Sequence, residues 1–328
     1  MGLEGDRVPA EASEPGSSAA AAGGSVVTVG AFDGIHLGHR ALIAAAIDRA
    51  RRLRLPAVVL TFSTHPAAVL RPDRAPALLT TRDERLEAIA SLGVDRLVVV
   101  PFTRVVADLS ARDFVAGVLV ANLGIKDLVI GHDHALGRDR VGDAAELRRL
   151  GGDLGFGVTV VDPVRLDRGG AVSSSAVRAA LERGDVGAAE AMLGRPYWLT
   201  GRVVRGEGRG REIGVPTANL DVGPEKLVPA AGIYAVRAWV GGAAPGDGGA
   251  RYPAAGPREA VLHIGPRPVF DDERPTIEAH IIGFSGDLYG RRLRVELVQR
   301  IRDVEDFESV ESLVAAIRRD VLAAQEVL

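Results

Sequence analysis

The chain contains Ser25-Val26-Val27-Thr28-Val29-Gly30-Ala31-Phe32-Asp33-Gly34-Ile35-His36-Leu37-Gly38-His39, the stretch that decides its fold. An apolar run typical of a strand leads into a glycine-rich turn, and the turn leads into a helical pattern. The first turn of a helix has unpaired backbone N–H groups and the positive end of the helix dipole, which together stabilise a polyphosphate. His36 and His39 share one face of that turn and can donate to phosphate oxygens, while Gly38 lets a ligand come close.

Two histidines at this spacing also occur among zinc ligands. Zinc needs further ligands, and the chain contains no cysteine. The remaining histidines show no tight zinc-type spacing; they are His65, His132, His134, His263 and His280. The strand–turn–helix context therefore favours a phosphate site over a metal site or an accidental pair.

Length and charge restrict the class of protein. At 328 residues the chain exceeds a typical single domain, so two domains are expected. A formal net charge of -3 argues against a general nucleic-acid binder, which normally has a strong basic excess. No apolar stretch reaches the roughly 18 residues that span a bilayer, so no membrane partner is expected. The absence of cysteine excludes disulfides and fits a cytoplasmic protein.

The first residues differ in composition from the rest of the chain. Residues 1–24 are rich in Ala, Gly, Ser and Pro, and they lack a basic start followed by a long apolar block. We interpret them as a disordered tail rather than a signal peptide.

The first half of the chain alternates strand-like and helix-like segments, which predicts a parallel α/β sheet. Thr81-Arg82-Asp83-Glu84 fits a helix capping box. In such sheets ligands bind beyond the carboxyl ends of the strands, where the histidine pair is expected. The expected strands are residues 26–29, 58–62, 97–102, 128–130 and 158–161.

After Tyr197 the pattern changes to short β runs separated by glycine-rich turns, which predicts an antiparallel barrel. An amphipathic helix is expected from about Ser309 to Glu326, covering one side of the barrel. Residues 241–256 are expected to form an exposed loop. The expected strands are residues 201–205, 233–240, 260–264, 276–284 and 293–301.

Several residues outside the first motif have the chemistry of a phosphate site. Ser173, Ser174 and Ser175 precede a helical pattern, so they can cap it and offer hydrogen-bond donors, and Arg178 suits phosphate through its planar fork. The glycine-rich loop at residues 206–211 is a weak signal, because such loops also form plain turns.

Glu278 lies in the apolar β run Ile277-Glu278-Ala279-His280-Ile281-Ile282. A carboxylate in such a run is paired, takes part in chemistry, or lies on an exposed edge strand, and the run alone leaves these alternatives open. His280 shares its face of the strand, and a satisfied structural role is equally open for it.

The stretch Gly30–His39 resembles the Gly-x-Phe-Asp-Gly-x-His-x-Gly-His signature of a nucleotidyltransferase superfamily. Within it, the chain is most similar to the bacterial bifunctional riboflavin kinase/FAD synthetase family. Further ordered motifs support the resemblance from about residue 25 to the C-terminus. They are Thr61–Pro66, Ser173–Arg178, Gly214–Asn219, Gly232–Ala235 and Glu278–His280.

The resemblance implies a Rossmann-like nucleotidyltransferase domain at residues 25–184, a linker at 185–196, and a riboflavin kinase barrel with a terminal helix at 197–328. It further implies that riboflavin and ATP give FMN, and that FMN and ATP give FAD. ATP is then the co-substrate and Mg²⁺ the expected metal. The oligomeric state is not predicted.

The resemblance also assigns roles to individual residues. For Asp33, bonding to turn amides is an equally good alternative to ligand contact. In the first domain the implied catalytic residues are His36, His39 and Arg178, and the implied binding residues are Gly30, Phe32, Asp33, Gly38, Asp133, Ser173, Ser174 and Ser175. In the second domain Glu278 is the implied base, Thr217 the magnesium ligand, and Gly206, Gly208, Gly210, Arg211, Thr217 and Asn219 the implied ATP-binding residues.

The chain departs from the family pattern at three places. Residues 131–137 lack both aromatics of the family's Gly-x-[Asn/Asp]-Phe-x-Phe-Gly segment, Ser63-Thr64 replaces Asp-Pro, and His263 replaces an asparagine. These changes leave two alternatives open. One is a paralogue that uses a modified flavin or another phosphate acceptor, and the other is a catalytically weak flavin- or nucleotide-binding sensor. The retained Glu278 argues against the sensor, because binding alone needs no base.

Overall fold

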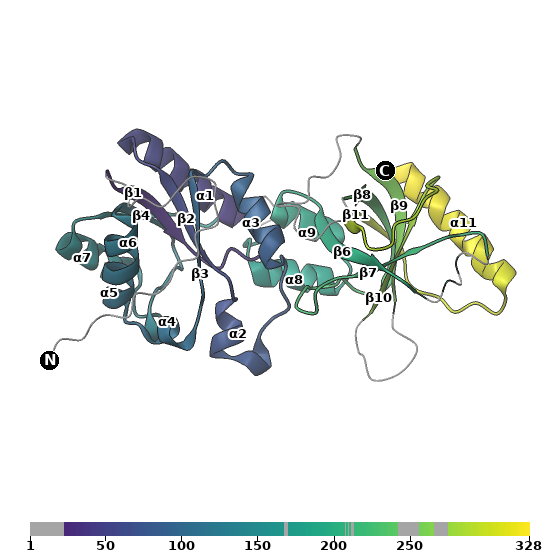
Figure 1. Ribbon diagram of the computed structural model, residues 1–328, viewed down its shortest axis with the longest axis horizontal. Helices are drawn as coiled ribbons and strands as arrows, with labels where there is room; N and C mark the ends of the chain where they lie inside the picture. Colours follow the sequence, from purple (N-terminus) through teal and green to yellow (C-terminus); the bar gives the residue numbers. More distant parts are fainter. Residues whose placement is uncertain are drawn as a thin grey trace. The chain divides into compact units, whose positions relative to one another are not determined.

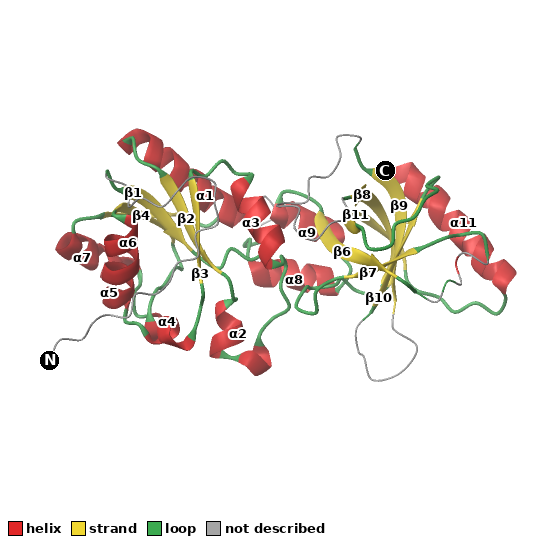
Figure 2. Ribbon diagram, viewed as in Figure 1, coloured by secondary structure: helices red, strands yellow, loops and turns green. Residues whose placement is uncertain are grey.

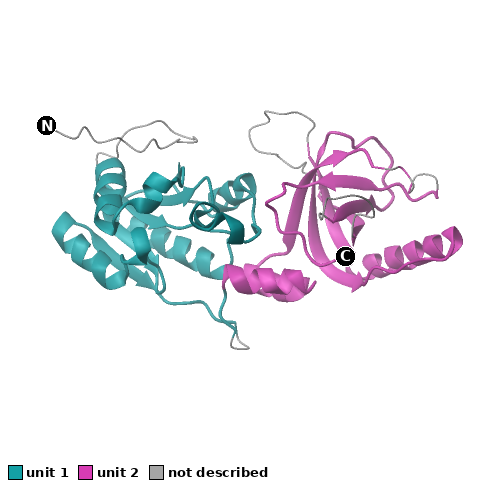
Figure 3. Ribbon diagram, turned by 90° about the horizontal axis from the view of Figure 1, so that it is seen from below, with its two compact units in different colours: residues 1–172 teal, residues 173–328 magenta. Residues whose placement is uncertain are grey.

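The computed structural model describes residues 23–166, 170–206, 208, 210, 213–241, 256–265 and 275–328. The chain divides into two compact units, residues 1–172 and 173–328 (Figure 3). The predicted tail lies outside the described residues up to residue 22, as do residues 242–255 of the predicted exposed loop. The division precedes the predicted boundary at residue 184, so that the helices just before the predicted barrel belong to the second unit.

The first unit is an α/β structure (Figure 1). Its strands are β1 (Ser25–Val29), β2 (Ala57–Phe62), β3 (Arg96–Val100), β4 (Ile125–Gly131) and β5 (Gly157–Val161). Its α-helices are α1 (Leu37–Leu53), α2 (Pro66–Leu70), α3 (Arg82–Ala90), α4 (Arg104–Asp108), α5 (Ala111–Phe114), α6 (Ala121–Leu123) and α7 (Ala144–Leu154). Short 3-10 segments lie at Pro72–Arg74 and Arg138–Arg140, and a π-helical segment lies at Val115–Val120.

All pairings in the sheet are parallel, and the strand order is β3-β2-β1-β4-β5. The expected strands and the parallel sheet are therefore confirmed. Successive side chains of a strand point to opposite faces, so Val26 packs with α1 and α3 whereas Val27 packs with α5 and α7. Both faces are covered by helices, which explains why the strands read as continuous apolar runs.

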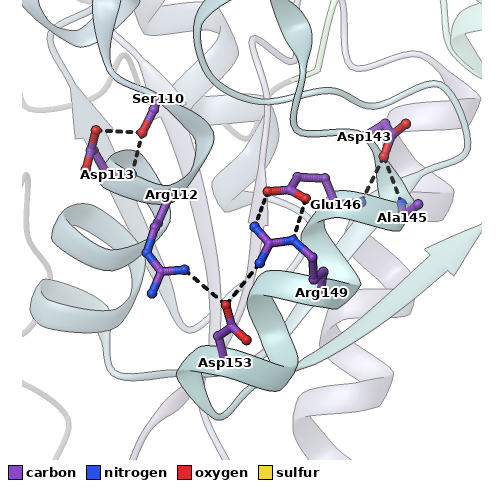
Figure 4. Close-up of polar contacts among 8 residues, drawn as sticks. All are labelled: Ser110, Arg112, Asp113, Asp143, Ala145, Glu146, Arg149 and Asp153. Atoms are coloured by element: carbon purple, nitrogen blue, oxygen red, sulfur yellow. Dashed lines mark hydrogen bonds and ion pairs between the residues drawn. The ribbon is translucent and has the colours of Figure 1, made fainter.

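Local signals begin and connect the helices as expected. The capping box at α3 is confirmed, because Thr81 and Glu84 bond each other's backbone. On the surface, an ion-pair network links α5 to α7: Arg112 and Arg149 both bond Asp153, at 3.0 and 3.2 Å (Figure 4). These side chains are solvent-exposed, so the network adds little stability and has no feature of a binding site.

The second unit begins with two helices and continues as a closed antiparallel barrel (Figure 2). The barrel order is β10-β7-β6-β11-β8-β9, which confirms the expected architecture. The helices are α8 (Ser174–Glu182), α9 (Val186–Leu193) and α11 (Val310–Val327). The strands are β6 (Tyr197–Val204), β7 (Ala218–Asp221), β8 (Gly232–Val240), β9 (Arg258–Gly265), β10 (Thr276–Ile281) and β11 (Arg292–Arg302).

Alternation along the strands decides which side chains face outward. Along β10, Ile277, Ala279 and Ile281 are buried, whereas Glu278 and His280 are half-buried on the other face. Helix α11 packs against β8, β9 and β11, which confirms the expected terminal helix. Among the helices of the described residues, none combines the length and the apolar character needed to cross a membrane.

Candidate active sites

The histidine pair lies at the start of α1, just after the loop that follows the carboxyl end of β1, and His39 is in the first turn of the helix. His36 is the N-cap of α1, and its Nδ1 accepts a hydrogen bond from the backbone N–H of His39 at 3.3 Å. The two imidazole rings are stacked, with centroids 3.6 Å apart and planes 18° apart. Because Nδ1 of His36 is an acceptor, the proton of the neutral ring lies on Nε2, which is then a donor for a ligand.

His39 is held in the neutral state. Burial, and secondly the charge of His36, lower the pKa of His39 well below its ordinary value. Its Nδ1 is buried and has no hydrogen-bond partner among the described residues. The edge of the ring contacts Phe32 at a centroid distance of 5.3 Å. His39 therefore offers a neutral hydrogen-bonding group rather than a positive charge.

The backbone of this loop is conformationally costly. Phe32 and Ile35 have positive φ angles of 50° and 45°, which non-glycine residues rarely adopt. Both side chains are buried, and their packing holds the backbone in place. A Cβ on Gly38 would lie 3.2 Å from the His36 ring, so this glycine makes room for the imidazole itself. A Cβ on Gly30 would similarly lie 3.1 Å from the Phe32 ring.

Asp33 bonds to a distant segment of the first unit. Its carboxylate is 2% exposed and accepts hydrogen bonds from the backbone N–H of Leu79 at 3.0 Å and of Thr80 at 2.9 Å. The Thr80 hydroxyl also donates to it at 3.0 Å. The structural alternative considered for Asp33 is thus present, with the amides coming from the residues before α3 rather than from its own turn.

The serine run begins α8, as expected, and lies in the second unit. Ser173 is the N-cap, and its hydroxyl accepts a hydrogen bond from the backbone N–H of Ala176 at 3.2 Å. Ser174 and Ser175 form the first turn, and Arg178 follows one turn later. The predicted phosphate residues are therefore divided between the two units, with the histidine pair in the first.

The segment after β4, where both family aromatics are absent, is built around two differently placed side chains. Leu136 is 8% exposed and belongs to the apolar core beneath the sheet. His134 is half-buried, its buried Nε2 has no partner in the part of the chain that the structure describes, and burial lowers its pKa to about 4. Asp133 is exposed, and its backbone carbonyl accepts a hydrogen bond from Arg140 at 3.1 Å.

In the second unit, polar side chains form a row across three neighbouring strands of the barrel. Glu278 of β10 lies opposite Asn219 of β7 on one side and His263 of β9 on the other. The Thr217 hydroxyl donates a hydrogen bond to Oε2 of Glu278 at 3.0 Å. Glu278 is therefore on a paired strand with a hydrogen-bonded carboxylate, which removes the edge-strand alternative.

The glycine-rich loop lies directly against this row. A Cβ on Gly206 would overlap the side-chain amide of Asn219, and a Cβ on Gly210 would lie 3.2 Å from the Thr217 hydroxyl. Gly208 has a φ of 79°, a conformation that favours glycine. Arg211, also predicted to bind ATP, lies outside the described residues.

The two histidines of this region differ in their surroundings. Burial lowers the pKa of His263, partly opposed by the charge of Glu278. Nδ1 of His280 lies 2.9 Å from the carbonyl oxygen of Pro216, so this imidazole supports the loop before β7. The described residues contain no cluster of three or more histidines and carboxylates that could hold a metal. The oxygens of Thr217 and Asn219 remain as ligands of the kind that magnesium prefers.

An α/β unit with a histidine pair at a helix start, followed by a barrel with a hydrogen-bonded glutamate, fits a two-domain enzyme that acts on nucleotide phosphates. Two family profiles fit this division: FAD synthetase matches residues 18–176, and riboflavin kinase matches residues 193–328. The chain belongs to the family of bifunctional riboflavin kinase/FMN adenylyltransferases.

Curated relatives carry this family name and match nearly the whole chain. The Escherichia coli K12 protein is 38% identical over 92% of each chain, the Pseudomonas fluorescens protein 39% over 92%, and the Bacillus subtilis protein 34% over 90%. A solved structure described as a macrolide-efflux protein from Streptococcus pneumoniae has a TM-score of 0.81 and 31% identity, with 96% of each chain covered. The family assignment rests on the profiles and the curated relatives.

Gly206→Ala should impair the barrel site, because the new methyl group would displace the Asn219 amide. We expect kcat/KM for riboflavin phosphorylation to fall at least tenfold, the range typical of misplaced catalytic groups. The control is Gly187→Ala in helix α9, where the nearest atom to the new methyl group would be at an ordinary van der Waals distance of 3.9 Å. This variant should leave the rate unchanged. An equal rate for the two variants would contradict the importance of this close approach.

His134, whose Nε2 is buried, should make the stability of the first unit pH-dependent. Its pKa is about 4 in the folded state against an ordinary 6.5, so the unfolded chain binds more protons below pH 6.5. The free energy of unfolding should therefore fall on acidification, by about 2 kcal/mol at pH 5 from this residue. Urea unfolding at pH 7 and pH 5 measures this fall in the free energy of unfolding. The fall should be smaller for His134→Gln than for the wild-type protein. The control His132→Gln, at the exposed neighbouring histidine, should show the same fall as the wild-type protein.

Proposed function

We propose that the second unit transfers the γ-phosphoryl group of ATP to the terminal ribityl hydroxyl of riboflavin, with Glu278 as general base. This proposal rests mainly on the hydrogen bond from Thr217 to Glu278, within the row of side chains that includes Asn219. Glu278 accepts the hydroxyl proton, the hydroxyl oxygen bonds to phosphorus, and ADP leaves. The hydrogen bond from Thr217 orients the carboxylate of Glu278. Because Thr217 is the donor, the lone pairs of its own hydroxyl oxygen stay available for a metal ion.

The residues of this site fit a magnesium ion. Thr217 and Asn219 are the residues that would hold it, because a hard cation prefers neutral and anionic oxygen ligands and retains waters. Bound magnesium neutralises charge on the transferring phosphate. The glycines at 206 and 210 bring the backbone of the loop close to the same two side chains.

We propose that the first unit transfers the adenylyl group of ATP to FMN. The phosphate oxygen of FMN attacks the α-phosphorus and pyrophosphate leaves, so the enzyme needs no nucleophile of its own. Nε2 of His36, the His39 ring and the first N–H groups of α1 stabilise charge on the phosphates. For Ser173–Ser175 and Arg178, at the start of α8 in the second unit, a role as phosphate donors remains a prediction from the resemblance.

We place both reactions in the cytoplasm, with riboflavin, FMN and ATP as the small-molecule partners and no nucleic acid or membrane. A different acceptor in the first unit is not favoured. The loss of aromatics after β4 is explained at Leu136 by a core position, which needs an apolar side chain of fitting size rather than a flavin contact.

Glu278→Gln should retain the fold and nucleotide binding but lose FMN formation, because it removes the base and keeps the shape. General bases typically contribute about 10²–10⁴-fold, and we expect a loss in that range. The measurement is FMN formed from riboflavin and ATP, separated by chromatography. Glu259→Gln, on the neighbouring strand and exposed, is the matched control. A wild-type rate for Glu278→Gln would rule out this assignment.

His36→Ala should abolish FAD formation from FMN while FMN formation from riboflavin continues, since the two sites belong to separate units. Both rates are measured on one preparation, so the kinase activity is the internal control for protein quality. Simultaneous loss of both activities would argue that one shared site performs both reactions.

A further inference from the structure

The loop that leads to the histidine pair is hydrogen-bonded to the segment before α3. Asp33 accepts three hydrogen bonds from Leu79 and Thr80, and the Thr80 hydroxyl in turn accepts one from the backbone N–H of Gly34 at 3.1 Å. The contacts are buried, and they join residues 46 or 47 positions apart in the sequence. The position of the loop therefore depends on the position of the segment at residues 79–81.

Arg85 lies in the first turn of α3, directly after this segment, and is 1% exposed. Its Nη2 donates to the backbone carbonyl of Phe62, the last residue of β2, at 2.5 Å. Burial lowers the pKa of Arg85, and the nearby charge of Asp33 partly opposes this. Arg85 is thus a buried cation that bonds the end of β2 and is attracted by the charge of Asp33, the carboxylate that holds the loop after β1.

Packing of α3 does not explain why a cation occupies this position. Ile89, one turn along the same helix, is fully buried and supplies the apolar contact with the sheet. A buried cation costs free energy in desolvation, and an apolar side chain of similar volume is often at least as stabilising. Nε of Arg85 has no partner within the described ranges, so even its hydrogen bonding is incomplete.

We propose that Arg85 is a positioning residue for adenylyl transfer, which holds the carboxyl end of β2 and, through Asp33, the loop of His36 and His39 in their working arrangement. The two loops lie at the carboxyl ends of neighbouring strands, since β1 pairs with β2. The inference rests on the proposed function of the first unit. It adds a residue that contacts neither ATP nor FMN.

The test uses the full-length chain with Arg85→Gln and Arg85→Lys. Asp127→Asn is the matched control, because Asp127 is also a 1% exposed charged residue of this unit, bonded to Arg49 and Thr159 near the amino end of β4. Rates of FAD formation from FMN are measured against ATP concentration, together with FMN formation from riboflavin. Calorimetry gives the thermal midpoint of each variant, and assays are run well below it.

We expect Arg85→Gln to lower kcat/KM for FAD formation about 10- to 100-fold, the range for residues that orient catalytic groups, with a raised KM for ATP. Loss of folded molecules lowers the apparent kcat but leaves KM unchanged, so the KM identifies the positioning role. Arg85→Lys should recover part of the loss, and Asp127→Asn should lower the thermal midpoint while KM stays constant. FMN formation should be unchanged throughout.

An unchanged KM for ATP in Arg85→Gln, or the same KM change in Asp127→Asn, would overturn the positioning role. If Arg85→Gln fails to fold, Arg85→Met decides the question, since it keeps most of the length of the side chain without the cation, and a wild-type KM there at a lowered midpoint would make the role purely structural. Absence of FAD formation by the wild-type protein would instead refute the proposed function, and the two failures are distinguishable.

Discussion

The strands of both units bury apolar side chains, and this constraint decides where polar chemistry can lie. In the first unit both faces of the sheet are covered by helices, so polar groups gather at the strand ends, where the chain leaves the core. In the barrel the inward side chains fill the interior, and the outer face of β7, β10 and β9 is left for Asn219, Glu278 and His263. The proposed site of the first unit therefore lies at the ends of the strands, and that of the barrel lies on an outer face, because the remaining surfaces of both sheets are filled by apolar side chains.

Each site also depends on short backbone approaches that only small residues allow. Gly38 lies against the His36 ring, and Gly206 lies against the Asn219 amide. In both cases the glycine accommodates a side chain of the protein that belongs to a proposed site. The glycine-rich character of nucleotide sites is usually explained by the approach of the ligand, but here part of it prepares the site before any ligand arrives.

Sequence reasoning predicts the parts of this structure that have a local pattern. The apolar runs locate all five strands of the sheet, and the Thr81–Glu84 box locates α3. Strand β7 is not among the expected strands because it is four residues long and follows Pro216 in a segment rich in loop residues. The partners of Asp33 are far away in the chain, and Arg85 lies among the charges of a helix start, so neither pairing has a local signature.

The stacking of His39 on His36, with the pKa of His39 lowered, has a consequence for the conditions under which the proposed site of the first unit works. Attraction between a lysine or arginine and a phosphate weakens as ionic strength rises, because counter-ions screen exposed charges over about 10 Å or less. A neutral imidazole that donates a hydrogen bond at short range within a buried loop is screened far less. If the loop binds the triphosphate as proposed, the contribution of His39 to that binding should therefore change little with the salt content of the cell.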